Sequence, residues 1–212
     1  MVPRIVVARD RPETALLDAV KAIHAGGVIA MPTDTFYGLA ADPFRADSVA
    51  KIFAVKGRSA ERALPLIAAD AEQVRDRIGA LPPLAERLAS RFWPGPLTLL
   101  LVAPSTLAEA VSGGTGKVGV RVPDHAVARA LCAACKTPLT ATSANISGTP
   151  PSSDPDEIWR TLGDRVDVLV DAGMTAGGAP STVVDTTGAM PVIVREGAIS
   201  WTAIQACLLD AV

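Results

Sequence analysis

The 212-residue chain has few of the residues on which many structural and catalytic sites depend. It has three cysteines, two histidines and only 4% aromatic residues. Three cysteines are too few for a disulfide scaffold and suit a reducing compartment. The chain also lacks an uninterrupted apolar run of about 18 residues, the length that a membrane-spanning helix needs. Its N-terminus, MVPRIVVARDRPE, carries charges where a signal peptide needs an apolar run, so we expect a cytoplasmic protein without a membrane partner.

Charge of one sign is not in excess either. The formal net charge is -2 and the pI is near 5.7, so any polyanion would have to be met by a local basic patch. The segment KIFAVKGRSAERALPLI, residues 51–67, forms such a patch. Its charged residues are Lys51, Lys56, Arg58 and Arg62, with Glu61 as the single acid. An anion-binding site and a solvated helix end are both compatible with this pattern.

Helical and strand-like segments alternate along the chain, and 49% hydrophobic residues can form the core of one domain. The apolar periodicity predicts helices within residues 11–27, 47–57, 71–78, 83–92 and 125–136. Strand-like runs are VIAM, LPLIA, LTLLLVA, VGVRVP, PLTATS and DVLVDAG, and STVVDTTGAMPVIVREG predicts a terminal antiparallel hairpin. The segment TPPSSDPDE, residues 149–157, is expected to be a surface loop. These elements predict an α/β fold with a twisted mixed sheet flanked by helices.

The sequence context argues against two apparent motifs, one rich in glycine and one formed by two cysteines. GTGKVG, residues 114–119, matches the spacing of a dinucleotide-binding loop, but it leads into a strand where that motif requires a helix. A Walker A loop is excluded because Val118 replaces the required Ser or Thr. Cys132 and Cys135 form C-x-x-C inside a predicted helix with no second ligand pair nearby, which favours a buried helix face over a metal site.

Nucleophilic catalysis is not indicated. The two histidines, His24 and His125, lie in or beside predicted helices, and no serine lies in a G-x-S-x-G elbow. Chemistry that positions charge around reactive phosphates fits the basic patch better.

Small polar side chains follow two of the predicted strands. Thr33 and Thr35 lie in MPTDTFYGLAADP after the strand VIAM, and Ser143 and Asn145 follow the strand-like run PLTATS. Ligands of α/β proteins bind at such strand ends. Ordinary capped turns would have the same composition, so both interpretations stay open for each segment.

Taken together, these segments resemble a known family. PTDTFYGL, KGR followed by PLI, VGVRVP and the S-x-N of TSANISG occur in this order in the YrdC-like family, whose members are threonylcarbamoyl-AMP synthases. The resemblance extends from residue 12 to residue 198, and residues 199–212 are expected to form a short helix or tail without a second domain. It implies a large, positively charged concave cavity. The anions of the basic patch would then be the phosphates of ATP.

The resemblance also implies an activity. Family members join L-threonine, bicarbonate or carbon dioxide, and ATP to give L-threonylcarbamoyl-AMP and pyrophosphate, which is a nucleotidyltransferase reaction. Partner proteins then transfer the threonylcarbamoyl group to adenosine 37 of tRNA. Mg²⁺ is expected to accompany ATP, with no metal site made by the protein itself.

The implied site has two halves. By resemblance, Thr35, Arg121 and Ser181 contact the substrate threonine. The nucleotide-binding residues would be Lys56, Arg58, Arg62, Lys117, Ala141, Ser143, Asn145 and Arg195. Of these, Lys56 and Arg58 would be catalytic, because they would stabilise charge that builds on the phosphates.

Two departures from the family pattern stand out. Long members have a histidine at the end of the PL-containing strand, where this chain has Ala68 and Ala69. Long members also have a second C-terminal domain, and this chain resembles the short form. Two other functions compete: a carbamoyl-adenylating enzyme, and a non-enzymatic module that binds structured RNA directly.

Overall fold

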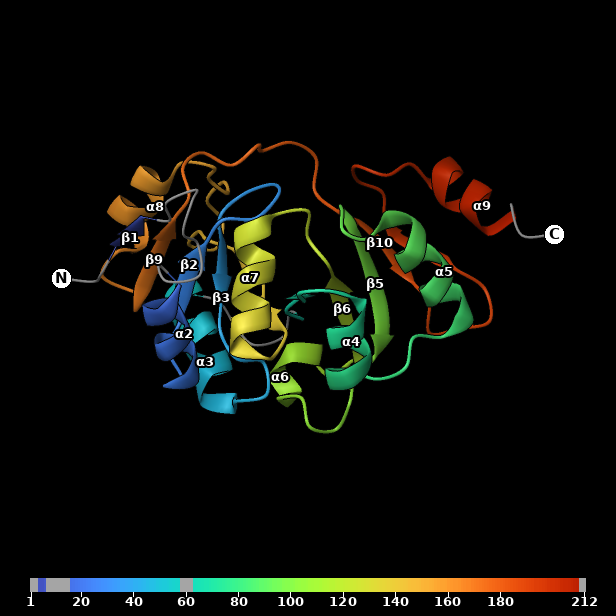
Figure 1. Ribbon diagram of the computed structural model, residues 1–212, viewed down its shortest axis with the longest axis horizontal. Helices are drawn as coiled ribbons and strands as arrows, with labels where there is room; N and C mark the ends of the chain where they lie inside the picture. Colours follow the sequence, from blue (N-terminus) through green and yellow to red (C-terminus); the bar gives the residue numbers. More distant parts are fainter. Residues whose placement is uncertain (1–3, 7–15, 58–62, 210–212) are drawn as a thin grey trace.

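The computed structural model describes residues 4–6, 16–57 and 63–209, and its strands form two mixed β-sheets with helices packed against them (Figure 1). None of the helices in these ranges has an apolar segment of the length that a bilayer span requires. The predicted α/β class is confirmed, with the strands divided between two sheets.

The first sheet has five strands. In spatial order they are β1 (Arg4–Val6), β9 (Val168–Asp171), β2 (Ile29–Met31), β3 (Gly38–Ala40) and β8 (Thr142–Ser143). β9 pairs in parallel with both β1 and β2, whereas β3 is antiparallel to β2 and to β8. The turn between β2 and β3 therefore contains the predicted threonine-rich segment.

The second sheet has six strands. Their order is β11 (Val192–Arg195), β10 (Thr182–Asp185), β5 (Leu97–Val102), β6 (Lys117–Arg121), β4 (Leu66–Ile67) and β7 (Leu139–Thr140). β10 and β11 form the predicted antiparallel hairpin, while β10 is parallel to β5 and β4 is parallel to β6. β5 and β6 pair antiparallel and connect the two parallel pairs.

One strand-like run of the sequence, PLTATS, contributes to both sheets. Its first part, β7, pairs with β4, and its second part, β8, pairs with β3. Between them, the Ala141 amide donates a hydrogen bond to the Pro65 carbonyl at 2.8 Å. Ala141 and Ser143 are thus placed where the two sheets meet.

Eight helices lie in the described part of the chain. They are α2 (Leu17–His24), α3 (Ala46–Lys56), α4 (Ala71–Arg77), α5 (Pro83–Phe92), α6 (Glu109–Ser112), α7 (Ala126–Cys135), α8 (Pro155–Leu162) and α9 (Trp201–Leu209). α3 ends, as predicted, at Gly57, whose left-handed φ of 59° suits a residue without a side chain. α2 packs on α7, and α5 packs on α9. Within the stretch after residue 198, expected as a short helix or tail, the described residues include α9.

The sequence-based assignment missed α8. Residues 149–157 were predicted to be a surface loop, but the helix begins at Pro155. The Asp154 side chain accepts a hydrogen bond from the Asp156 amide at 2.9 Å and caps the helix. An acidic N-cap followed by proline at the first helical position is a helix-start signal. The same residues, rich in proline and serine, also have the composition of a surface loop.

Candidate functional site

A cavity of about 390 Å³ lies where loops of the two sheets come together. Six of the residues named from the sequence line it: Thr35, Arg121, Ala141, Ser143, Ser181 and Arg195. Phe36 and Thr98 also contribute to its wall. Segments that are far apart in the sequence, from the β2–β3 turn to β11, therefore meet at one site.

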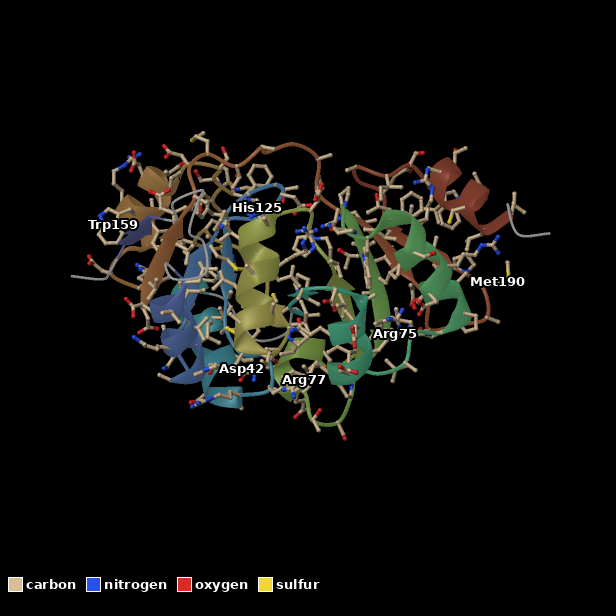
Figure 2. All side chains as sticks on the ribbon, viewed as in Figure 1. Asp42, Arg75, Arg77, His125, Trp159 and Met190 are labelled. Atoms are coloured by element: carbon tan, nitrogen blue, oxygen red, sulfur yellow. The ribbon has the colours of Figure 1, made fainter. Side chains whose placement is uncertain are left out.

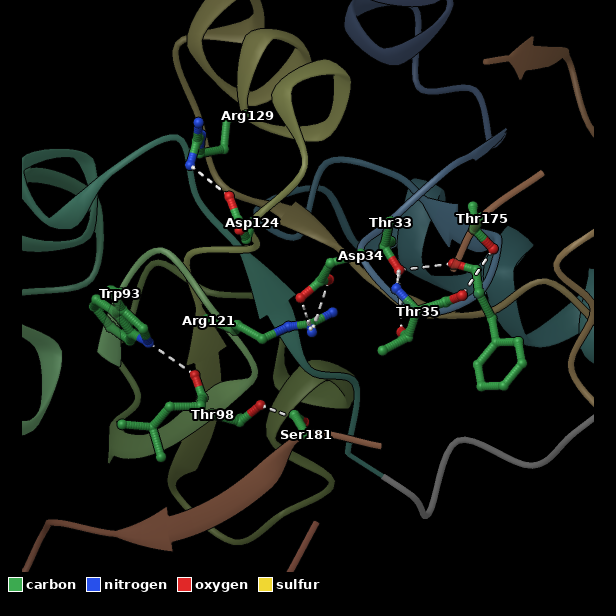
Figure 3. Close-up of polar contacts among 12 residues, drawn as sticks. Thr33, Asp34, Thr35, Trp93, Thr98, Arg121, Asp124, Arg129, Thr175 and Ser181 are labelled. Carbon is green, nitrogen blue, oxygen red and sulfur yellow. Dashed lines mark hydrogen bonds and ion pairs between the residues drawn. The ribbon is translucent and has the colours of Figure 1, made fainter. Parts of the chain in front are cut away.

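The β2–β3 turn is held by hydrogen bonds of its own (Figure 3). The Thr33 hydroxyl donates to the Phe36 carbonyl at 2.7 Å, and the Thr35 amide donates to the Thr33 hydroxyl at 3.2 Å. The Thr35 carbonyl accepts bonds from the Thr175 hydroxyl and from the Gly177 amide, each at 2.7 Å. This network fixes the backbone and leaves Thr35 in the wall of the cavity.

Arg121 ends β6 and is 9% exposed. Its Nη1 lies 2.9 Å from Oδ1 and 3.0 Å from Oδ2 of Asp34 (Figure 3). Burial lowers the pKa of the Arg121 guanidinium; the carboxylate of Asp34 acts in the opposite direction, and the nearby charge of Arg195 adds to the lowering. Asp34 was missed from the sequence, although it lies between the two threonines of the motif.

Ser181 and Arg195 come from opposite sides of the β10–β11 hairpin. Arg195 donates to the Ser181 carbonyl through Nε at 3.1 Å and through Nη2 at 2.8 Å, and Nη2 lies 3.1 Å from the Ser181 hydroxyl. The hydroxyls of Ser181 and Thr98 are 2.8 Å apart. Thr98 was also missed, and its signal was a polar residue inside the apolar run LTLLLV.

Lys56 is not among the residues that line the cavity, and its role in nucleotide binding stays a prediction. It is 2% exposed, and its Nζ donates to the Ser143 carbonyl at 2.5 Å and to the Asn145 side chain and carbonyl at 2.9 and 3.1 Å. The Ser143 hydroxyl donates to the same Asn145 side-chain oxygen at 2.6 Å. Of these three residues, Ser143 is the one in the cavity lining.

Of the remaining cations, the structure describes Lys117 and Lys51, and neither lines the cavity. Lys117 begins β6, at the end opposite Arg121, and its Nζ pairs with Asp185 at 2.6 Å. Lys51 donates to the Gly26 carbonyl at 2.7 Å, away from Lys56. Arg58 and Arg62 lie outside the described residues, so their assignments stay predictions.

The rejected motifs are placed as expected. The glycine-rich segment leads into β6, and Cys132 and Cys135 lie on the buried face of α7. Burial raises the pKa of both thiols, that of Cys135 to about 12. Within the described ranges, no three His, Cys, Asp or Glu side chains cluster as metal ligands would.

His125 lies at the N-terminal end of α7 (Figure 2), and burial lowers its pKa. Position 68, where long family members have a histidine, holds a fully buried alanine whose amide donates to the Arg121 carbonyl at 2.9 Å.

A second cavity, of about 530 Å³, lies between α5 and α9 and includes Met190, labelled in Figure 2. The described residues that line it include none of the predicted site residues. The smaller cavity is the candidate site because it contains the polar and charged groups that bind ligands.

A family model named for Sua5, YciO and YrdC, and described as telomere recombination, matches residues 21–197. The chain belongs to this Sua5/YciO/YrdC family. The match includes the β2–β3 turn, β6 and the β10–β11 hairpin, which contribute Thr35, Arg121 and Arg195 to the cavity.

Relatives and a solved structure agree with this membership. The chain is 37% identical to the threonylcarbamoyl-AMP synthase of Bacillus subtilis (strain 168), over 91% of this chain and 56% of that protein. It is 39% identical to the threonylcarbamoyl-AMP synthase of Marinobacter nauticus, over 79% of this chain and 88% of that protein. The crystal structure of Pyrococcus abyssi Sua5 complexed with L-threonine superposes with a TM-score of 0.90 at 33% identity. That superposition covers 99% of this chain and 61% of the Pyrococcus chain, so the chain spans a little over half the length of some relatives.

Proposed function

We propose that the chain is an L-threonylcarbamoyladenylate synthase, a nucleotidyltransferase that uses L-threonine, bicarbonate or carbon dioxide, and ATP. The observation that carries this proposal is the position of Arg121, a buried guanidinium in the wall of a cavity between the hydroxyl-bearing residues Thr35 and Ser181. Relatives named threonylcarbamoyl-AMP synthase support it.

The threonine half of the site would contain Thr35, Arg121 and Ser181. A free amino acid brings a carboxylate, which a planar guanidinium binds with two parallel hydrogen bonds. The substrate hydroxyl needs a fixed polar partner, and a site that hydrogen-bonds this hydroxyl rejects analogues that lack it. Thr35 and Ser181 offer such hydroxyls on the same cavity wall.

The nucleotide half would contain Ala141, Ser143 and Arg195, with Arg58 and Arg62 as predicted phosphate ligands. Lys56 would act on this half through the Ser143–Asn145 segment that it holds. Mg²⁺ would enter with ATP, because it retains several waters and is commonly bound through substrate phosphates. We propose that the cavity is positively charged when these cations are in place.

The proposed reaction needs no protein nucleophile. The deprotonated amine of threonine adds to carbon dioxide and gives a carbamate. A carbamate oxygen then attacks the α-phosphorus of ATP, the bond from that phosphorus to the bridging oxygen breaks, and pyrophosphate leaves. Fixed cations stabilise the charge that develops on the phosphates. The product would be consumed by transferase proteins that act on tRNA adenosine 37.

The test is an assay with ATP, bicarbonate and equal concentrations of threonine, serine, valine or alanine, with mass detection of the adenylate. Threonine is expected to be preferred over serine, because one methyl group in a packed pocket contributes about 1–3 kcal/mol. Valine and alanine are expected to react less than serine, since each leaves a buried hydroxyl partner unsatisfied at about 1–3 kcal/mol.

Two results would contradict the proposal. Equal turnover of valine and threonine would mean that Thr35 and Ser181 do not recognise the substrate hydroxyl. No amino-acid-dependent pyrophosphate release would favour the carbamoyl-adenylating alternative, or, if structured RNA bound with a steep salt dependence, the RNA-binding module.

A further inference from the structure

Asp34 and Arg121 form an ion pair at the edge of the cavity. The pair involves one side of the guanidinium. Both oxygens of Asp34 lie within 3.0 Å of Nη1, and each of the two side chains is 11% exposed. Among the residues that the structure describes, no other group is hydrogen-bonded to the Arg121 side chain. Arg121 lines the cavity, whereas Asp34 is not part of the lining. The carboxylate therefore holds Nη1 from outside the cavity and leaves Nε and Nη2 for a ligand.

The pair also offsets a charge repulsion within the cavity. Arg121 and Arg195 line the same cavity and repel one another. A buried cation is costly unless a counter-charge is close to it. Asp34 supplies that counter-charge without occupying the space that a substrate carboxylate needs.

We propose that Asp34 is a positioning residue that orients the Arg121 guanidinium to receive the carboxylate of the amino-acid substrate. This inference rests on the proposed function and assigns a role to a residue beyond the threonine-contacting set. Asp34 acts through Arg121 and does not itself touch the substrate.

A substitution of Asp34 could also change substrate binding by displacing the β2–β3 turn, because Asp34 lies between Thr33 and Thr35. The turn is held by the Thr33 hydroxyl bond to Phe36 and by the bonds of Thr175 and Gly177 to Thr35. None of these bonds uses the Asp34 carboxylate. Loss of its charge should therefore leave the position of Thr35, and the recognition of the substrate hydroxyl, unchanged.

The first experiment compares wild type, Asp34→Asn and a control, Asp47→Asn, which removes the carboxylate of an exposed pair with Arg45. In the threonine-dependent adenylate assay, D34N is expected to raise KM for threonine about tenfold or more, because misplacing a binding group by about 1 Å can reduce rates by about 100-fold. The KM for ATP should stay unchanged in D34N, and D47N should behave as wild type. An unchanged KM for threonine in folded D34N overturns the proposal.

The second experiment asks whether Asp34 acts through Arg121. In a double-mutant cycle with Arg121→Ala, the D34N change should add nothing further to the threonine KM, since the two residues act as one unit. Additive effects would overturn the proposal. The ratio of threonine to 2-aminobutyrate turnover, which reports the hydroxyl, should be the same in D34N and wild type; a fall in that ratio would assign the effect to the turn instead.

Two further measurements separate the positioning role of Asp34 from a failure of D34N to fold and from a failure of the proposed function. If D34N fails to fold, Asp34→Glu keeps the charge but displaces it by one methylene, and a threonine KM equal to that of wild type would overturn the proposal. If wild type itself forms no adenylate with threonine, the proposed function fails. In that case, L-threonine binding measured by calorimetry decides the positioning role, with weaker binding expected for D34N and equal binding overturning it.

Discussion

Arg121 and Lys56 are both almost completely buried, and both belong to motifs that resemble the family pattern, yet they are held in different ways. Arg121 pairs with a carboxylate on one nitrogen and lines the cavity. Lys56 donates to two backbone carbonyls and one side-chain oxygen of the Ser143–Asn145 segment, and it is not part of the cavity lining.

The difference follows from the chemistry of the two side chains. A guanidinium has five N–H donors in a rigid fork, so one nitrogen can be anchored while others face a ligand. An ammonium has three donors on a compact charge, and in Lys56 the described bonds direct that charge at protein oxygens. A buried cation at a candidate site can therefore either meet the ligand or hold the loop that meets it.

The largest expected effect is that of Arg121→Ala. Removing Arg121 leaves the Asp34 charge buried and unpaired, which should lower the free energy of unfolding by about 3–5 kcal/mol. In protein that remains folded, the KM for threonine should rise strongly, so that turnover at the wild-type threonine concentration falls sharply. Urea unfolding of Arg121→Ala and of a control variant would check the loss of stability. The control is Arg45→Ala, which breaks an exposed ion pair. If the two variants lost the same free energy of unfolding, the buried pair would contribute no more to stability than the exposed pair.

Arg58→Ala tests the part of the basic patch that lies outside the described residues. If Arg58 binds phosphate, its removal should weaken nucleotide binding by about 1.5–3 kcal/mol, the range for hydrogen bonds to charged groups. Stability should change little. Calorimetric titration with ATP measures the effect, and unchanged ATP affinity and turnover in the folded variant would reject the assignment.

Lys56→Met distinguishes the two roles of a buried cation most directly. Methionine keeps an apolar stem but cannot donate to the Ser143 and Asn145 oxygens, so we expect a loss of about 1–3 kcal/mol of stability together with weaker ATP binding. The control is Lys51→Met, which removes an exposed lysine of the same helix whose ammonium donates to the Gly26 carbonyl. Weaker ATP binding with full stability would indicate that Lys56 meets phosphate directly, as the sequence predicted.

The smallest effects are expected at Cys132 and Cys135. Cys132→Ser and Cys135→Ser should retain turnover and lose roughly 1 kcal/mol of stability or less, because a serine at 132 can donate to the Ile67 carbonyl that the thiol now faces. Since burial raises both thiol pKa values, both groups stay protonated at pH 8, and native protein should alkylate slowly at these positions. Loss of turnover without unfolding, or bound stoichiometric zinc, would show that the C-x-x-C motif was wrongly dismissed.

The fold class, most helices and strands, and six of the residues that line the cavity could be predicted from the sequence. Apolar periodicity and glycine stops are local signals, so the end of α3 at Gly57 and the β10–β11 hairpin could be predicted without any tertiary contact. The residues Thr35, Arg121 and Ser181 were found because their motifs occur in the family order.

The partners of these residues depend on tertiary contacts, which no local sequence signal encodes. Asp34 meets Arg121, Lys56 meets Ser143, and Thr98 meets Ser181 across long stretches of sequence. The tertiary structure also divided the run PLTATS between two sheets, because each half pairs with a strand from a different part of the chain. Strand propensity depends on the neighbours against which a strand packs, and these neighbours lie far away in the sequence, so the run itself carries no signal of the division.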